Sequence, residues 1–334
     1  MNKKVIKYIP QVYAVNMLNI DSRQYIVAGS EGRYPSYIID LVSGDDTILT
    51  DGPGGTMCIV KIPGPETRLV SVMGLFPPFI GKESAIYIHA LKSGHWTTSR
   101  LFDLPFAHRC EVISDGEDVW LFAASVSSHK ADPGDWSNPG ELLVMKINAG
   151  NGSKASPEVL MTITRNHGMA CATVGGRKTL CISGAEGIFS FSPSNEDQWS
   201  VKKIVDFEVS EFAFTDLDGD GVDELVTIEP FHGNILAIYK YEERKWNRYF
   251  EDKLDFGHGL CTGIFKGIPT IVTGNRSGDR SLVKYSILDL LNGKIARSVL
   301  ENDVGPSQTM IFKYNSTDYI LSANQARNEV SLYY

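Results

Sequence analysis

Short runs of β-branched and aromatic residues alternate with clusters of Gly, Pro, Asn and Asp along the whole chain. No long stretch keeps the 3.6-residue period of an amphipathic helix, so the pattern predicts an all-β protein. Pairs of adjacent runs recur seven times, from YAVNMLNI with QYIVAGS near the N-terminus to SQTMIFKY with YILSAN near the C-terminus. A third run, such as IFSFS or ILAIYKY, usually follows each pair, and a fourth often follows that.

Four antiparallel strands in every ~40 to 60 residues are typical of a β-propeller blade. We therefore predict one seven-bladed β-propeller domain over residues 1–334. The last blade reaches only its third strand at SLYY, which leaves KKVIKYIP at the N-terminus to close it as the fourth. This closure would leave no open sheet edge. A β-sandwich or barrel is the alternative, but neither requires seven repeats with the same order and spacing of strands.

Composition and charge narrow the class of protein. With 43% hydrophobic and 22% charged residues, the chain has an ordinary globular composition. A net charge of −8 argues against a nucleic-acid partner, because such binding depends on Lys and Arg. No apolar run has the length of a signal peptide or membrane span. We expect a cytoplasmic protein that contacts no membrane, with a homodimer as a possible assembly. Its cysteines are predicted to be small reduced core residues: Cys58, Cys110, Cys171, Cys181 and Cys261.

The sharpest local motif is DLDGDGVDE at residues 216–224. Asp216, Asp218, Asp220 and Glu224 stand at positions one, three, five and nine, and the carbonyl of Val222 at position seven. With a glycine at position six, this spacing can wrap a hard cation such as calcium or magnesium. The flanking runs EFAF and ELVTI are strands, which excludes an EF-hand. Since one blade of seven carries the loop, we predict a structural cation site; an acidic hairpin without metal is the alternative.

Histidine is scarce, with seven in the chain, yet three histidines open predicted inner strands. These are His108, His167 and His258. In a propeller the turn between the second and third strands returns to the face where the inner strand begins, so His232 in the EPFHGN turn is expected beside them. We predict that the four imidazoles share one divalent transition metal, Zn, Mn, Fe or Ni. A single strand histidine is more often structural, and the convergence of four favours a site.

Other turns on this face are predicted to bring charged, aromatic and amide side chains together. Such a mixture suits a polyhydroxylated ligand better than an apolar one. The predicted substrate-binding residues are Arg33, Tyr34, Trp136 and Arg276. The predicted catalytic residues are His108, Lys130, Asp135 and Arg109, the arginine as a group that orients hydroxyls.

Four segments together resemble the β-propeller domain of aldos-2-ulose dehydratase (1,5-anhydro-D-fructose dehydratase) and its bacterial FG-GAP/VCBS-type relatives. They are HRCEV…DWSNPG, NHGM…SGAEGIF, DLDGDGVDE…IEPFHGN and GHGL…GNRSGD. The resemblance implies a metal in the central cleft and elimination of water from a ketosugar. Its matching positions are His108, His167, His232 and His258, with Arg109, Asp135 and Trp136 in the accompanying motif. The sequence shows no cupin or lectin domain of the fungal enzyme, so no cupin-dependent isomerisation is expected.

These observations predict an enzyme, a metal-dependent carbon–oxygen lyase of the hydro-lyase type that acts on a keto- or anhydro-sugar. Two other functions stay open. A carbohydrate-binding or scaffolding propeller would need the calcium-type loop but no metal at the histidines. A metal-dependent sugar lactonase would be expected to offer carboxylate ligands where this chain offers mostly imidazoles.

Overall fold

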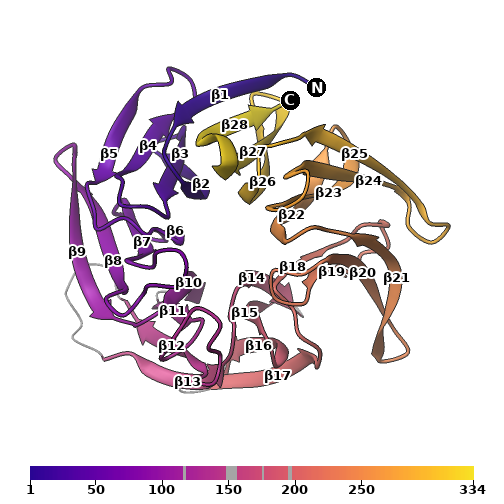
Figure 1. Cartoon of the computed structure of the whole chain (residues 1–334), viewed down its shortest axis with the longest axis horizontal. Coiled ribbons are helices and arrows are strands. Elements are labelled where there is room, and N and C mark those ends of the chain that lie inside the picture. Colours follow the sequence, from indigo (N-terminus) through magenta and orange to yellow (C-terminus); the bar gives the residue numbers. More distant parts are fainter. Residues whose placement is uncertain (116–117, 148–155, 175–176, 195–197) are drawn as a thin grey trace. The chain divides into compact units, whose positions relative to one another are not determined.

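The computed structural model describes residues 1–115, 118–147, 156–174, 177–194 and 198–334 (Figure 1). Within these ranges the chain forms strands β1 to β28 and one short 3-10 helix, η1. The strands make seven four-stranded sheets, in which neighbouring strands such as β1 and β28, β10 and β11, and β18 and β19 pair antiparallel. The predicted seven-bladed β-propeller is therefore confirmed, including its last blade, which the N-terminal strand completes.

The chain divides into two compact units, which are described separately below. The first contains residues 1–15 and 208–334, and the second contains residues 16–207. The boundary near the N-terminus falls inside a strand, β2. The single domain predicted over residues 1–334 stays a prediction.

The second unit holds four sheets made of consecutive strands. Its first sheet is β2 (Val12–Ile20), β3 (Arg23–Ser30), β4 (Ser36–Asp40) and β5 (Asp46–Thr50). The next is β6 (Cys58–Ile62), β7 (Arg68–Met73), β8 (Ala85–Lys92) and β9 (His95–Asp103). The third is β10 (Ala107–Asp115), β11 (Asp118–Ser125), β12 (Gly140–Lys146) and β13 (Glu158–Ile163). The fourth is β14 (Met169–Val174), β15 (Arg177–Gly184), β16 (Gly187–Pro193) and β17 (Trp199–Val205).

The first unit holds the other three sheets. One is β18 (Glu211–Thr215), β19 (Glu224–Glu229), β20 (Ile235–Glu242) and β21 (Lys245–Lys253). The next is β22 (Gly257–Phe265), β23 (Ile268–Asn275), β24 (Leu282–Asp289) and β25 (Lys294–Glu301). The last is β26 (Pro306–Tyr314), β27 (Thr317–Asn324), β28 (Glu329–Tyr333) and β1 (Lys3–Tyr8), with η1 (Gln325–Arg327) before β28. Figure 1 shows β1 beside β28, with both chain ends close together.

The sheets are held by side chains buried on both faces, which is why their middle strands read as nearly continuous apolar runs. All six residues of β19 are buried. In the first unit, Val226 and Ile228 of β19 pack in one cluster with Leu236, Ile271 and Tyr285. This packing fixes both ends of β19, which adjoin the acidic loop on one side and the turn that carries His232 on the other.

The cysteines follow the prediction only in part. Cys58, Cys110 and Cys181 are buried thiols, and the Sγ atoms of Cys58 and Cys110 lie 3.1 Å apart without a disulfide. Cys171 is exposed and Cys261 is half-buried, so placing all five in the core was wrong. Cys171 lies inside an apolar run, but it is on β14, which is an edge strand of its sheet. Within the described residues, no helix could span a membrane.

Candidate functional site

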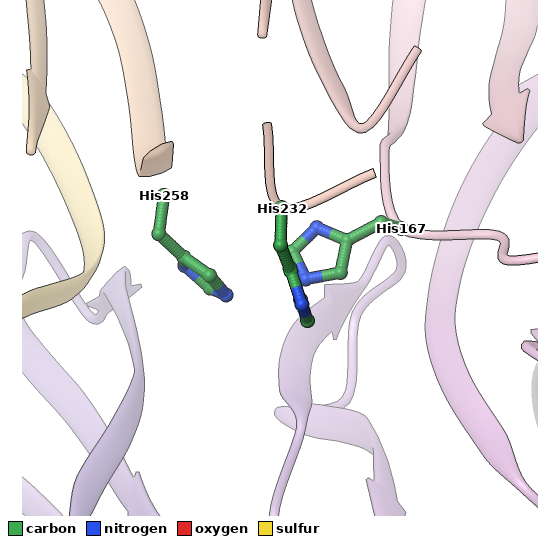
Figure 2. A group of neighbouring side chains, drawn as sticks. All are labelled: His167, His232 and His258. Carbon is green, nitrogen blue, oxygen red and sulfur yellow. The ribbon is translucent and has the colours of Figure 1, made fainter. Parts of the chain in front are cut away.

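Two histidines of the first unit come together at one end of their sheets. His258 is the second residue of β22, and His232 lies in the connection between β19 and β20. Their ring centroids are 5.5 Å apart, and a nitrogen of one ring lies within 4.8 Å of a nitrogen of the other. Figure 2 shows both imidazoles projecting to the same side of their backbone segments. The turn between the second and third strands of one sheet, β19 and β20, therefore lies beside the start of β22, the first strand of the next sheet.

The hydrogen bonds of His258 determine its tautomer. Its Nδ1 lies 2.5 Å from the carbonyl oxygen of Ser307, which can only accept a hydrogen bond, so Nδ1 carries the proton and donates it. In a neutral ring Nε2 is then an acceptor, and the hydroxyl of Tyr13 lies 3.2 Å from it. The ring is buried, with 1% of its surface exposed. A histidine held in this way through Nδ1–H to a backbone carbonyl presents its Nε2 lone pair in a fixed direction, as metal-ligating histidines do.

His232 is held by its aromatic neighbours and by an unusual backbone conformation. Its ring stacks between Phe231 and Phe256, at centroid distances of 4.0 and 4.5 Å. Its φ is +47°, in the left-handed region that residues with a side chain seldom adopt. The backbone N–H of His232 donates to the hydroxyl of Ser210 at 3.2 Å. The turn therefore places a half-buried imidazole in one orientation.

Arg276, which the sequence analysis predicted to bind substrate, contacts Tyr13 and Phe256, the neighbours of His258 and His232. Its guanidinium is 5.7 Å from the ring centroid of Tyr13 and donates a hydrogen bond to the side-chain oxygen of Gln325. Its backbone N–H donates to the carbonyl oxygen of Phe256 at 3.0 Å. A fixed arginine next to imidazoles can donate several hydrogen bonds to the hydroxyls of a sugar.

A second pair of histidines lies within the second unit. The ring centroids of His108 and His167 are 4.5 Å apart, and both rings are buried. His108 is the second residue of β10, but His167 precedes β14 by two residues instead of opening it. Arg109 Nε donates to the carbonyl oxygen of His167, so this arginine fixes the backbone beside the histidine. Its guanidinium is buried, which disfavours a direct role in orienting a ligand.

In three strands, β10, β22 and β26, the register of pairing with the next strand shifts near the start of the strand, where His108, His258 and Ser307 lie. In β10 the register shifts between Ala107 and Arg109, which leaves His108 as the extra residue. In β22 it shifts between His258 and Cys261, and in β26 after Pro306. Bulges of this kind bend the strand and redirect a side chain, and they are common next to functional sites. They explain how residues of a regular ladder come to face the end of the sheet.

The long turn between β11 and β12 holds the other predicted catalytic residues. The ammonium of Lys130 lies 3.2 Å from the ring centroid of Trp136 and 5.0 Å from that of Phe79. It also donates to the backbone carbonyl of Asp135 at 2.6 Å. Burial lowers the pKa of Lys130, which makes it a better proton acceptor at neutral pH than an ordinary lysine.

Asp135 is a poor candidate for a base because its carboxylate is already engaged. It accepts hydrogen bonds from the hydroxyl of Ser137 at 2.6 Å and from the backbone N–H groups of Ala131 and Ser137 at 2.9 and 3.0 Å. These bonds, led by the Ser137 hydroxyl, lower the pKa of Asp135. Its carboxylate therefore orders the turn.

A cavity of about 750 Å³ opens in the second unit beside this turn. Arg33 and Lys130 line it together with Phe76 and Phe79. Arg33 lies over the ring of Phe76, with its guanidinium carbon 4.2 Å from the centroid. Cations flanked by aromatic faces are suited to a polar ring such as a sugar. Tyr34 is exposed.

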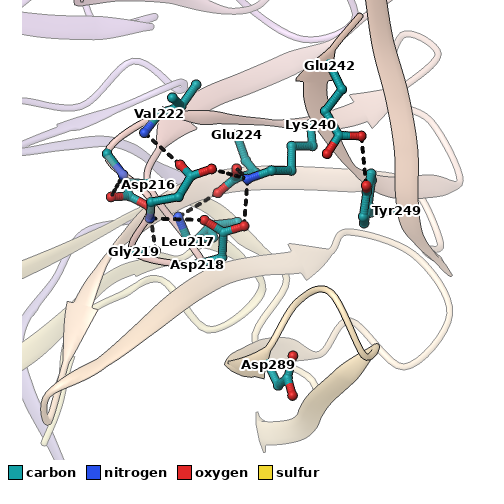
Figure 3. A network of polar contacts seen from close by, with 12 residues as sticks. Asp216, Leu217, Asp218, Gly219, Val222, Glu224, Lys240, Glu242, Tyr249 and Asp289 are labelled. Atoms are coloured by element: carbon teal, nitrogen blue, oxygen red, sulfur yellow. Dashed lines mark hydrogen bonds and ion pairs between the residues drawn. The ribbon is translucent and has the colours of Figure 1, made fainter.

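The acidic loop of residues 216–224 lies between β18 and β19, as predicted (Figure 3). Carboxylate oxygens of Asp216, Asp218 and Glu224 lie within 4.8 Å of one another, which would suit a cation. However, the ammonium of Lys240 already lies 2.6 Å from Asp218, 2.7 Å from Asp220 and 3.1 Å from Glu224. The residues present do not offer a divalent ion the open set of oxygens that the sequence suggested. A calcium or magnesium ion here stays a prediction.

Sequence reasoning missed Tyr13, Ser307 and Lys240. Tyr13 and Ser307 are the second residues of β2 and β26, the same position that His108 and His258 hold in β10 and β22. Alignment of the inner strands by their first residues would have found both. The sequence gives no such signal for Lys240, because its ion pairs with the loop carboxylates depend on which side of β20 faces the loop.

The imidazoles fit a transition metal, since neutral ring nitrogens are ligands that Zn, Mn, Fe and Ni accept and the Nδ1–H of His258 is already held by a carbonyl. The shared four-histidine site predicted from the sequence draws on both units and stays a prediction. The three other histidines, all among the described residues, have different environments: His89 is buried between hydroxyls, and His95 and His129 are exposed.

No protein-family model matches this sequence, and no curated protein matches it. Solved structures do resemble the fold. A protein of Bacteroides uniformis named as a candidate 6-phosphogluconolactonase shares 11% identity at a TM-score of 0.57, over 93% of this chain and 88% of the other. BBS1N in complex with ARL6DN shares 11% at 0.56, over 99% and 94%. Trypanosoma rangeli sialidase shares 11% at 0.50, over 82% of this chain but only 53% of its own. At these identities the likeness establishes the fold alone.

Proposed function

We propose that this protein is a metal-dependent carbon–oxygen lyase that eliminates water from a keto- or anhydro-sugar. The observation that carries the proposal is the held tautomer of His258, whose Nδ1–H is bonded to the Ser307 carbonyl, together with a ring nitrogen of His232 within 4.8 Å of one of its own. The four segments from HRCEV to GNRSGD resemble the aldos-2-ulose dehydratase propeller, and this resemblance supports the proposed reaction type. The second pair, His108 and His167, would offer the same kind of ligand in the other unit.

A divalent transition ion at these nitrogens would supply a Lewis acid that polarises the sugar ketone. The chain supplies orientation and proton transfer. Arg276, held by Gln325, offers N–H donors to ring hydroxyls, and the Tyr13 hydroxyl, whose proton is donated to His258, can accept a hydrogen bond from the same ligand. The burial that excludes water from Tyr13 and His258 strengthens each of these bonds.

The elimination needs one base and one acid. The base removes the proton from the carbon next to the ketone; the carbon–oxygen bond of the β-hydroxyl then breaks, and its oxygen leaves with a proton as water. A conjugated enone remains. We assign the base to Lys130, because burial lowers its pKa, in preference to Asp135, whose carboxylate is engaged by Ser137 and Ala131.

Elemental analysis followed by turnover tests this assignment. Untagged protein should contain a transition metal, and with 1,5-anhydrofructose or a 3-ketoglycoside it should produce new ultraviolet absorbance from the enone. His258→Ala and His232→Ala should lose metal and activity while their circular dichroism stays native. His95→Ala is the matched control, since His95 is an exposed histidine at the start of β9. Metal-loaded protein that leaves both sugars intact would refute the lyase assignment.

A sugar lactonase is the second candidate, because the chain shares its fold with the candidate 6-phosphogluconolactonase of Bacteroides uniformis. The cavity beside Arg33 and Lys130 would suit the negative charge of a phosphorylated lactone. Hydrolysis of a lactone releases acid and forms no enone. A pH indicator in weak buffer, run beside the absorbance assay, therefore separates the two activities.

A further inference from the structure

The acidic loop between β18 and β19 resembles a calcium loop in sequence, but its interior is already occupied. Lys240 lies on β20, next to the strand on which the loop ends, and its ammonium meets carboxylate oxygens of Asp218, Asp220 and Glu224 (Figure 3). An ammonium group has three N–H donors, and each has one carboxylate here. The lysine thus makes the contacts that would otherwise attract a metal ion.

The remaining carboxylate oxygens serve the backbone of the loop. Asp216 accepts the N–H groups of Gly219 and Gly221, at 2.7 and 2.9 Å, with its two oxygens. Glu224 accepts the N–H of Leu217 at 2.7 Å with the oxygen that does not face Lys240. The loop is therefore ordered by its own amides and one internal cation.

Burial makes this arrangement exclusive. The side chains of Lys240 and Asp218 are 9% exposed and that of Glu224 is fully buried, whereas Asp220 is 45% exposed at the edge of the loop. A divalent ion bound by the same oxygens would lie within a few ångströms of the ammonium, where like charges repel strongly in a poorly solvated setting. The loop interior can hold either the Lys240 ammonium or a divalent ion. Because Lys240 is covalently part of the chain, its ammonium is always at hand.

We propose that the ammonium of Lys240 is the resident cation of this loop, so that the protein folds without calcium, and that Lys240 blocks a divalent-cation site which its removal would open. The loop is then a calcium-type loop in which a side chain has replaced the metal. This inference does not depend on the proposed lyase activity.

Thermal unfolding in calcium and in chelator tests the proposal on the wild-type chain. The melting temperature should be the same in both, and calorimetric titration should detect no calcium bound to the loop. A calcium-dependent rise in the wild-type melting temperature that Asp218→Ala removes would overturn the proposal.

Variants test the second half. Lys240→Met keeps the aliphatic part of the side chain but removes the ammonium group. The variant should melt below wild type in chelator, and its melting temperature should rise by about 5 °C in calcium a hundredfold above Kd. Lys240→Gln is a second variant should the methionine protein fail to fold. Lys245→Met, at an exposed lysine on β21, is the control and should not respond to calcium. Addition of Asp218→Ala to Lys240→Met should abolish the gained response, and a folded Lys240 variant indifferent to calcium would refute the blocked site.

Discussion

At the scale of single residues, His89 shows how burial sets the charge of a histidine outside the candidate site. It lies on β8 with no exposed surface, and its Nε2 and Nδ1 are 2.8 and 2.9 Å from the hydroxyls of Ser71 and Thr98. Burial lowers the pKa of His89 to about 4. The ring therefore stays neutral in the folded protein, where it links three strands of one sheet.

This lowered pKa makes stability depend on pH. The unfolded chain takes up the proton of His89 below pH about 6.5, whereas the folded chain resists until about 4, so the free energy of unfolding falls as the pH drops between these values. The expected loss from pH 7.5 to 5 is roughly 2 kcal/mol from this residue. His89→Gln keeps polar atoms near Ser71 and Thr98 but should flatten that dependence in urea titrations. His95→Gln should keep the wild-type slope; equal slopes for wild type and His89→Gln would contradict the prediction.

At the scale of elements, the turn from β19 to β20 depends on a glycine. A Cβ at Gly233 would lie 1.9 Å from the carbonyl oxygen of Glu229, within the backbone of the same turn. Gly233→Ala should therefore shift His232 and lower the free energy of unfolding by about 2 kcal/mol or more. Gly263→Ala is the control, because its Cβ would meet the side chain of Ile311 at an ordinary 3.4 Å. Chemical denaturation of both variants measures the difference, and equal stabilities would count against this account of the turn.

The strands themselves could be predicted because their pattern is local. The run YAVNMLNI became β2, EFAFTDL and ELVTIEP became β18 and β19, and KKVIKYIP supplied β1 of the last sheet. Alternating faces and turn residues at short intervals carry this information in the sequence. The position of the His232 turn followed from the same alternation.

The partners inside the candidate site could not be predicted in this way. Tyr13 meets His258 across 245 positions of sequence, and Lys240 meets Asp218 across the width of two strands. Such contacts depend on strand register and on bulges, which decide which side chains face each other. The loop sequence by itself suggested a metal ion at the place where the Lys240 ammonium lies. His167 was likewise placed on a strand that begins two residues later.

At the scale of the whole molecule, the last sheet joins the two ends of the chain. Lys3 of β1 lies 2.9 Å from Glu301 and 2.6 Å from Glu329, and the hydroxyl of Tyr333 donates to Glu301 at 2.7 Å. These half-buried charges fix the register of β1 on β28. Asn2 and Tyr334 exchange two backbone hydrogen bonds at 2.9 and 3.1 Å, which continues the pairing to the ends.

Removal of this ion pair should loosen the closure. Lys3→Met leaves the partly buried carboxylate of Glu329 without its cation, while Glu301 keeps its ion pair with Arg327. We expect a loss of about 1 kcal/mol in the free energy of unfolding, reduced from the value for a fully buried pair by the remaining exposure. Lys4→Met, at an exposed neighbour on β1, should change stability by less than about 0.5 kcal/mol. Hydrogen exchange should show faster exchange in β1 for the first variant alone; unchanged protection there would argue against the role of Lys3.

The pairing of β1 with β28 also sets an order of events on the ribosome. Lys3 and its partner Glu329 are 326 positions apart, so at roughly 5 to 20 residues per second β1 must wait about 15 to 65 s for its neighbour to be made. Throughout that time β1 lacks its partner strand, and its lysines, Lys3, Lys4 and Lys7, discourage pairing with other nascent chains. A gene rearranged to encode β1 directly after β28 would remove the wait, and more of the newly made protein should then be recovered in soluble form when synthesis proceeds without chaperones.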